Sequence, residues 1–303
     1  MSTIETASAP ERELAKSPPE FSCAEIWGGN RPIDTAIELP GVHGRVYSQP
    51  CRGGRGGDIH YVSLCNSGLL SRMCLADVAG HGETVALVSE EIHRLLRRFM
   101  DNLDERRVLA ELNRRLTRGT ETAMTTAVAV SYIPPLHLVY ISSAGHPPAW
   151  LYRRAEARWE RLAPCPGERE ERALVDLPLA VDAETRFSRR RVRVRPGDRL
   201  LLMTDGILEA PAPGGELFGE ERLAAVLDQQ HAAQAGELAH AIMAAVHAHV
   251  GRPQLVHDDV TLLVAEFTPG PRALGIWEVL KNRVLRPLGW GRGEPAQTAG
   301  GLT

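Results

Sequence analysis

The chain has 303 residues, of which 43% are hydrophobic, 24% charged and 5% aromatic. This balance fits a globular protein with one core and excludes a fibre, a disordered chain and a membrane channel. The 35 Lys and Arg against 38 Asp and Glu leave a net charge of −3, which gives no reason to expect nucleic acid as a ligand. Five cysteines without Cys-x-x-Cys spacing favour a reducing, cytoplasmic location over a disulfide framework.

Three parts are expected along the chain. Residues 1–38 are rich in Ser, Pro, Glu and Ala without a long hydrophobic pattern, so we expect a mostly disordered tail. Residues 39–268 carry a regular pattern of apolar runs and turn residues, which predicts one folded domain. Residues 269–303 differ again in composition and are expected to form a C-terminal amphipathic segment and tail.

Within residues 39–268, short apolar runs bounded by Gly, Pro and Asp alternate with longer amphipathic stretches. The short runs predict strands at 44–48, 59–64, 71–75, 125–132, 136–142, 149–152, 189–195, 199–204 and 260–267. Hydrophobic residues at helical spacing predict helices at 84–100, 103–116, 217–227 and 235–250. The runs from 125 to 152 suggest an antiparallel meander, and the charged segment 153–173 is expected to be an exposed loop.

The segment from Leu274 to Leu288 places apolar residues along one face of an expected helix and basic residues elsewhere. Such a helix packs on its own domain or on the mate in a homodimer. The alternative is contact with a membrane surface or with a partner protein. The pattern alone leaves these alternatives open.

Four acidic segments stand at predicted strand ends beside glycine or a second acid. They are Gly56-Gly57-Asp58, Asp77-Val78-Ala79-Gly80-His81-Gly82, Thr204-Asp205-Gly206 and His257-Asp258-Asp259-Val260-Thr261. Carboxylates that converge from rigid strand ends stay ionised together only if a cation offsets their repulsion. The chain has neither Cys-x-x-Cys nor two His at i, i+4, so this pattern favours Mg²⁺ or Mn²⁺ over zinc.

Further segments follow in the same order as in one known family. They are Ala123-Met124-Thr125-Thr126-Ala127, Ser143-Ala144-Gly145-His146-Pro147-Pro148, Leu177-Pro178-Leu179-Ala180-Val181, Pro196-Gly197-Asp198, Ile207-Leu208-Glu209-Ala210 and Leu217-Phe218-Gly219. With the acidic segments, they resemble the metal-dependent type 2C protein phosphatases, in the bacterial branch of the stage II sporulation protein E and the sigma-factor regulators. This resemblance implies an α+β fold, a four-layer α-β-β-α sandwich of two antiparallel sheets flanked by helices.

The resemblance also implies a site with two Mn²⁺ or Mg²⁺ ions. At the matching positions, Asp77 would bridge both ions and the backbone carbonyl of Val78 would bind one of them. Asp205 and Asp258 would bind the other ion. Asp58 would act through an ion-bound water or a weaker additional ion. Such a pair of ions activates water for in-line attack on phosphorus without a phosphoenzyme.

Other residues are candidates for supporting roles. Asp259 would orient the metal ligands, and Gly206 would let backbone and water approach them closely. His81 is a candidate catalytic proton donor to the leaving serine oxygen, with a structural role as the alternative. Arg52 and Arg55 precede Asp58 and are candidates for holding the substrate phosphate, with a solvated loop as the alternative. His146 is expected to be a turn residue.

The predicted function is that of a metal-dependent phosphoserine and phosphothreonine protein phosphatase. By analogy with the family, its substrate would be a phosphorylated regulatory protein such as an anti-sigma-factor antagonist. Two alternatives stay open from the sequence. One is a phosphatase acting on small phosphate esters, and the other is a catalytically silent scaffold that binds a regulator.

Overall fold

The structure is a computed structural model of the chain. It describes residues 25–29, 32–51, 56–64, 70–80, 83–99, 102–119, 123–162, 175–252, 255 and 257–269. The candidates His81, Arg52 and Arg55 and the expected helix from Leu274 to Leu288 lie outside these residues.

Two antiparallel sheets of six strands each form the centre of the domain. The first sheet has the order β1 (Glu25–Gly29), β4 (Asp58–Leu64), β5 (Ser71–Val78), β6 (Thr125–Ile133), β7 (Leu138–Ala144), β10 (Arg190–Arg193). The second has the order β2 (Ile33–Leu39), β3 (Val42–Gln49), β12 (Val260–Phe267), β11 (Arg199–Met203), β8 (Ala149–Arg153), β9 (Arg158–Leu162). Every pair of neighbouring strands runs antiparallel.

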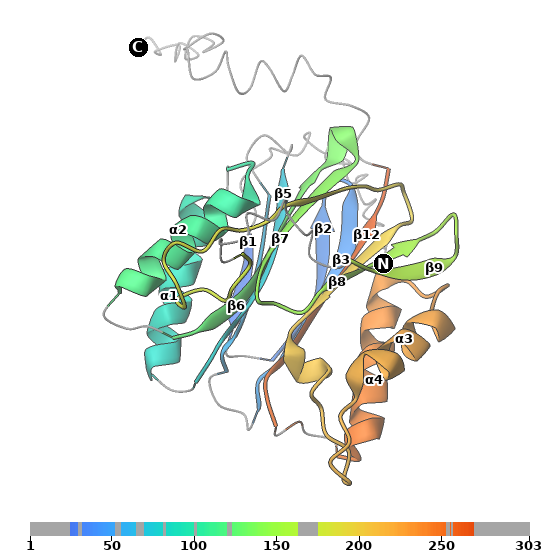
Figure 1. Cartoon of the computed structure of the whole chain (residues 1–303). Coiled ribbons are helices and arrows are strands. Elements are labelled where there is room, and N and C mark those ends of the chain that lie inside the picture. The colour runs from blue at the N-terminus through green and yellow to red at the C-terminus, as the bar shows by residue number, and fades with distance from the viewer. Residues whose placement is uncertain are drawn as a thin grey trace, which may run out of the picture.

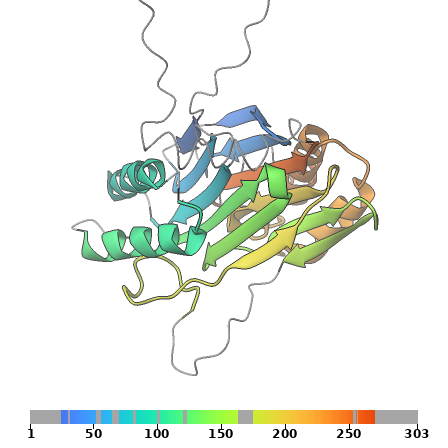
Figure 2. The same cartoon turned by 90° about the horizontal axis from the view of Figure 1, so that it is seen from above.

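Helices cover the outer face of each sheet, as Figures 1 and 2 show. On the first sheet lie α1 (Glu83–Arg98) and α2 (Glu105–Arg118), and on the second lie α3 (Gly219–Gln229) and α4 (Ala235–Val250). Short 3-10 helices occupy Pro134–Leu136 (η2) and Asp205–Ile207 (η3). Three apolar cores therefore separate four layers: one between the sheets and one beneath each helix pair. The predicted fold class is confirmed.

Strand β5 shows why the sequence folds this way. Its side chains alternate in direction, so that Met73 and Leu75 enter the core between the sheets while Cys74 and Ala76 enter the core beneath α1 and α2. A strand buried on both faces is apolar along almost its whole length. Asp77 stands near its end on the same face as Met73 and Leu75, and thus points toward the second sheet.

Most predicted elements between residues 39 and 268 are present, with ends shifted by a few residues. Helix α4 and strand β12 coincide with their predicted ranges. In α4, a capping box of Gln234 and Glu237 begins the helix, and Gly251 with φ of 68° ends it. Within the described residues, no helix is long and apolar enough to span a bilayer.

Three expectations need correction. Strands β1 and β2 lie before residue 39, so the ordered part begins within the segment expected to be a tail. Strand β9 lies inside the expected exposed loop. The sequence did not reveal it, because the charged Arg158 and Glu160 obscure the two-residue alternation around Trp159. The expected meander ends at β7: Gly145, with φ of 65°, and the two prolines that follow His146 carry the chain across to β8 in the second sheet.

Candidate functional site

The four acidic segments come together at one end of the two sheets. In the first sheet, Asp58 begins β4 and faces Asp77 of β5 as its direct cross-strand partner. In the second sheet, Asp205 follows β11 and Asp258 precedes β12, and these two strands are neighbours. The backbone N–H of Thr204 donates to the carbonyl of Thr261 at 2.9 Å, which extends their pairing to the site. The structure therefore joins the carboxylates that the sequence placed at separate strand ends.

The pKa of Asp77 shows that acids from both sheets act on one another. Burial raises the pKa of this half-buried carboxyl to about 7, and the charges of Asp205, Asp258, Asp259 and Glu209 add to the rise. All four of those acids come from the second sheet or the turns beside it. Because like charges disfavour ionisation, the raised pKa indicates that carboxylates from both sheets form one cluster.

Two other carboxyls at the mouth of the cluster behave in the same way. The pKa of Asp205 is raised by burial and by Glu209, and that of Asp258 is raised by burial and then by Asp205 and Asp259. The backbone N–H of Asp259 donates to the carboxylate of Asp258 at 2.8 Å, which counters part of the rise and fixes that side chain. Both acids are half-buried, so they remain within reach of solvent and of a ligand.

Asp58 lies deeper than the other acids, with 3% of its surface exposed. Burial raises its pKa well above the usual range, the charge of Asp77 adds to this, and hydrogen bonds from Thr204 and Thr261 oppose it. The hydroxyl of Thr204 donates to Asp58 Oδ2 at 2.8 Å. The hydroxyl of Thr261 lies 2.8 Å from that of Ser48 on the neighbouring strand β3. Asp58 is thus held beneath Asp77 by side chains of the opposite sheet.

Asp259 fixes the segment that leads into β4. Its carboxylate accepts hydrogen bonds from the backbone N–H groups of Cys51, at 2.7 Å, and Gly57. A Cβ atom on Gly56 would lie 2.2 Å from Asp259 Oδ2, so glycine is needed for this close approach. Asp259 was predicted to orient the metal ligands. In the structure its carboxylate fixes the backbone of the segment before Asp58.

Two glycines bring backbone close to the acids. A Cβ atom on Gly57 would lie 2.3 Å from the carbonyl oxygen of Val78 and 3.2 Å from Asp77 Oδ1. A Cβ atom on Gly206 would lie 1.9 Å from the carbonyl oxygen of Asp259. The turn after β11 is thus packed directly against the segment before β12. Any side chain at these two positions would push the carboxylates apart.

The donor set fits a hard divalent cation. It consists of carboxylates and a backbone carbonyl, which are the ligands that Mg²⁺ and Mn²⁺ prefer. Among the described residues, no three His, Cys, Asp or Glu side chains lie close enough to surround one ion by themselves. Mg²⁺ keeps several waters and needs few protein carboxylates, so a spaced cluster of this kind suits it better than a closed zinc cage would.

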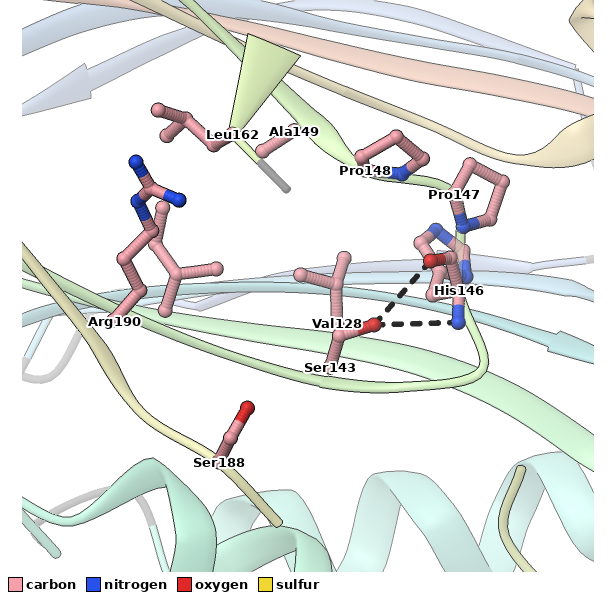
Figure 3. Close-up of a pocket in the computed structure, with 10 residues that line it drawn as sticks. Val128, Ser143, His146, Pro147, Pro148, Ala149, Leu162, Ser188 and Arg190 are labelled. Carbon is pink, nitrogen blue, oxygen red and sulfur yellow. Dashed lines mark hydrogen bonds between the residues drawn. The ribbon is translucent and has the colours of Figure 1, made fainter. Parts of the chain in front are cut away.

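His146 and the pocket beside it lie between the sheets and are shown in Figure 3. Burial lowers the pKa of His146 to about 3, so its ring is neutral, and Nδ1 lies 2.8 Å from the hydroxyl of Thr126. Ser143 Oγ bonds the backbone of His146 and stabilises the turn, as the dashed lines in Figure 3 show. The cavity measures about 30 Å³, enough for a single water, so it is not a substrate site.

Sequence reasoning missed four residues of the site. They are Ser48, Thr204, Thr261 and His257. Thr204, Thr261 and His257 stand inside the acidic segments themselves, so their proximity in sequence to Asp205 and Asp258 was the available signal. Ser48 carries no such signal, because only the pairing of β3 with β12 brings it near.

The comparisons with known proteins agree with this architecture. The family model described as Stage II sporulation protein E (SpoIIE) matches residues 70–268, about two thirds of the chain. The chain belongs to the stage II sporulation protein E family. Membership confirms the predicted resemblance, and with it the enzyme class of metal-dependent protein serine/threonine phosphatases. No curated protein matches the chain.

Solved structures of this group share its fold at low sequence identity. RsbX in complex with magnesium is 14% identical, with a TM-score of 0.57 over 78% of this chain and 100% of RsbX. The phosphatase domain of SpoIIE from Bacillus subtilis, with a fragment of its regulatory domain, is 17% identical, with a TM-score of 0.60 over 84% and 72%. The catalytic domain of PstP in complex with 2 manganese ions is 16% identical, with a TM-score of 0.52 over 82% and 100%. At these identities the likeness establishes the fold.

Proposed function

We propose that the acidic cluster is the two-metal centre of a protein phosphatase that removes phosphate from serine or threonine of a regulatory protein. The observation that carries this proposal is the convergence of the acidic segments. Asp58 pairs with Asp77 across the first sheet, and Asp205 and Asp258 stand at the paired ends of β11 and β12 in the second sheet. Carboxylates collected from two sheets repel one another, so folding alone gives no reason to gather them. A site that takes its cations from solution does need them.

The place of each acid supports a proposed role. Asp77 stands centrally and would contact both ions, beside the carbonyl of Val78. Asp205 and Asp258 stand at the mouth and would hold one ion from the second sheet. Asp58 is buried under Thr204 and would act on the site from beneath. When bound, two divalent cations lower the pKa of water and offset the charge of the phosphoryl group.

The identity of the ions is proposed as Mn²⁺ or Mg²⁺. The oxygen-only donor set supports either ion. RsbX with magnesium and PstP with manganese, which share the fold, support the same choice. His81 as proton donor and Arg52 or Arg55 as phosphate-binding groups stay predictions, because these residues lie outside the described ranges.

The substrate is proposed to be a phosphorylated regulatory protein of the anti-sigma-factor antagonist class, in a bacterial cytoplasm. A fold neighbour contains the RsbU and RsbW domains of one Mycobacterium tuberculosis protein, which supports a regulatory setting. The odd number of cysteines, without Cys-x-x-Cys spacing, supports a reducing compartment. Asp205 and Asp258 are only half-buried, which suits a substrate residue on the surface of a protein.

The test measures phosphate release from a phosphoserine regulatory protein and from small phosphate esters, with Mn²⁺, with Mg²⁺ and with EDTA. We expect metal-dependent release that is faster from the protein. Asp77→Asn and Asp205→Asn should each lower it by more than about 100-fold, beyond the 10–100-fold typical of residues that only support metal ligands. Asp34→Asn, on the exposed edge of the second sheet, is the matched control and should leave it unchanged.

Three results would contradict the proposal in different ways. Turnover that persists in EDTA, or in Asp77→Asn, would reject the metal centre. Faster release from small esters than from any phosphoprotein would reject the protein substrate. Tight Mn²⁺ binding without turnover on either would favour a binding scaffold.

A further inference from the structure

His257 links the two segments that carry the acids of the second sheet. Its Nε2 lies 2.7 Å from the carbonyl oxygen of Gly206. A carbonyl oxygen only accepts hydrogen bonds, so Nε2 carries the hydrogen and donates it. Gly206 directly follows Asp205, and His257 directly precedes Asp258. One side-chain hydrogen bond therefore ties the turn after β11 to the segment before β12.

The bond from His257 to Gly206 joins the two segments at a second point, separate from their backbone hydrogen bond. On the strand side, the backbone bond from Thr204 to Thr261 joins the same two segments. Beyond the acids, Gly206 packs against the carbonyl of Asp259 and the side chain of Val260, and His257 adds a side-chain hydrogen bond to this contact. Van der Waals contact limits only how closely the two segments can approach. A hydrogen bond also prevents separation, so His257 opposes opening of the turn away from Asp258.

The second ring nitrogen of His257 supports this assignment. Nδ1 is buried and makes no hydrogen bond with the described residues. Burying a ring nitrogen without a hydrogen-bond partner costs free energy, so hydrogen bonding at Nδ1 does not explain the position of the ring. The energy gained at Nε2 and the packing of the ring hold the side chain in position.

We infer that His257 is a positioning residue that sets the spacing of Asp205 and Asp258 for a bound divalent cation. This inference rests on the proposed two-metal function. The bond to Gly206 holds the segments that carry Asp205 and Asp258 near the spacing that a bound cation would require. Metal affinity then depends on a side chain that touches neither the ion nor the substrate.

The experiment compares three substitutions at this one position. Gln places an amide N–H₂ close to where His Nε2 stands, Asn is one carbon shorter and does not reach it, and Ala lacks a donor. Mn²⁺ affinity is measured by calorimetric titration of the metal-free proteins. The metal-free melting temperature reports folding. We expect His257→Ala and His257→Asn to weaken Mn²⁺ binding by about 10–100-fold, and His257→Gln to stay within about threefold of the wild type.

A kinetic readout separates positioning from general damage. The Mn²⁺ concentration for half-maximal phosphatase activity should rise in His257→Asn, while kcat at saturating Mn²⁺ and KM for the phosphoprotein change little. His43→Ala is the matched control, because His43 pairs with Glu38 at the opposite end of β12 from the acids. Its Mn²⁺ affinity should equal that of the wild type.

The outcomes distinguish this inference from the function on which it rests. Wild-type Mn²⁺ affinity in both His257→Ala and His257→Asn would overturn the positioning role and leave the phosphatase intact. Equal weakening in His257→Gln and His257→Asn would also overturn it, because the donated hydrogen bond would then not matter. A wild-type protein that binds no Mn²⁺ would overturn the metal centre and the role of His257 together. If the alanine variant fails to fold, the Gln and Asn pair still decides.

Discussion

Carboxylates at the edge of the second sheet and on α2 differ sharply from those in the acidic cluster. At that edge, Asp34 accepts a hydrogen bond from Arg45, which lowers the pKa of its carboxyl to about 2. On α2, Arg114 and Arg115 lower the pKa of Glu111. In the cluster, burial and neighbouring acids raise the pKa of Asp77 to about 7. The same chemical group thus lies beside a cationic side chain in one region and beside other acids in the other.

This difference shows how the chain reserves one region for ligands. Its 35 Lys and Arg would suffice to pair the acids of the cluster. Among the described residues they pair instead with surface acids such as Glu91, Glu160 and Glu216. Surface pairs of this kind contribute little to stability. Repulsion among the acids of the cluster costs stability, and a bound divalent cation would offset that cost.

The most damaging way to disturb the cluster without removing an acid is Gly206→Ala. The new methyl group would meet the carbonyl oxygen of Asp259 at 1.9 Å, so the turn carrying Asp205 must move. Overpacking of this kind costs roughly 1–3 kcal/mol. A displacement of about 1 Å at a catalytic group costs about 100-fold in rate, so we expect kcat/KM to fall by that factor or more.

Gly236→Ala is the control for this substitution. At Gly236, in the first turn of α4, the nearest atoms to an added Cβ lie 3.5 Å away on Arg45. We expect wild-type turnover and a stability change within about 1 kcal/mol, with a gain as the favoured direction. Equal activity in both alanine variants would show that the turn tolerates displacement, and that the acids need not be held so closely.

The fold could be predicted from the sequence wherever one physical signal dominated. Helix α4 has helical spacing and an αL glycine at its end, and β12 is a mainly apolar run, so both ranges were right. Strand β9 was missed because its charged residues hide the alternation. Strand β8 was predicted but placed in the wrong sheet, because the crossing after Gly145 depends on long-range packing that no local pattern encodes.

The site was predictable to the level of its charged residues and no further. Asp77, Asp205 and Asp258 stand at or beside strand ends, close to glycine or a second acid, so a metal-binding role could be predicted from the sequence. The depth of Asp58 and its bond from Thr204 were not, because these two residues are 146 positions apart. Hydrogen bonds across a sandwich depend on how the two sheets are placed, and hydroxyl residues are too common in sequence to reveal it.

The pH dependence of stability also distinguishes the acidic cluster from the paired surface acids. The pKa of Asp77 is raised on folding from 3.8 to about 7, so the folded state binds more protons between these values. Its stabilising contribution is complete below 3.8 and is lost as the pH rises through about 7. The buried His60 and His146 act with the opposite sign, because their pKa values fall to about 4 and about 3. Asp77→Asn removes the first contribution and leaves those of the two histidines. It also removes the charge that adds to the rise of the Asp58 pKa, which acts in the same direction as the loss of Asp77.

The measured quantity is therefore a difference between two metal-free proteins. In EDTA, the stability of Asp77→Asn relative to the wild type should rise by roughly 2 kcal/mol between pH 5 and pH 8. For a domain of this size, that corresponds to about 4–8 °C in melting temperature. The histidine contributions cancel in the difference. A difference that stays flat or falls with pH would mean that folding does not raise the pKa of Asp77. Repulsion from the other acids of the cluster would then be negligible.

The smallest effect is expected from Asp34→Asn, which removes the best-paired acid of the other region. The Asp34 side chain is 39% exposed, so the energy implied by its low pKa is screened by solvent, and we expect a loss below about 1 kcal/mol in urea unfolding at pH 7. Since its pKa is lowered on folding from 3.8 to about 2, its contribution is present above 3.8 and is lost as the pH falls through about 2. The two proteins should therefore converge in stability in strong acid. A loss well above 1 kcal/mol at pH 7, or reduced Mn²⁺-dependent turnover, would show that the paired acids also support the cluster and that the two regions are not independent.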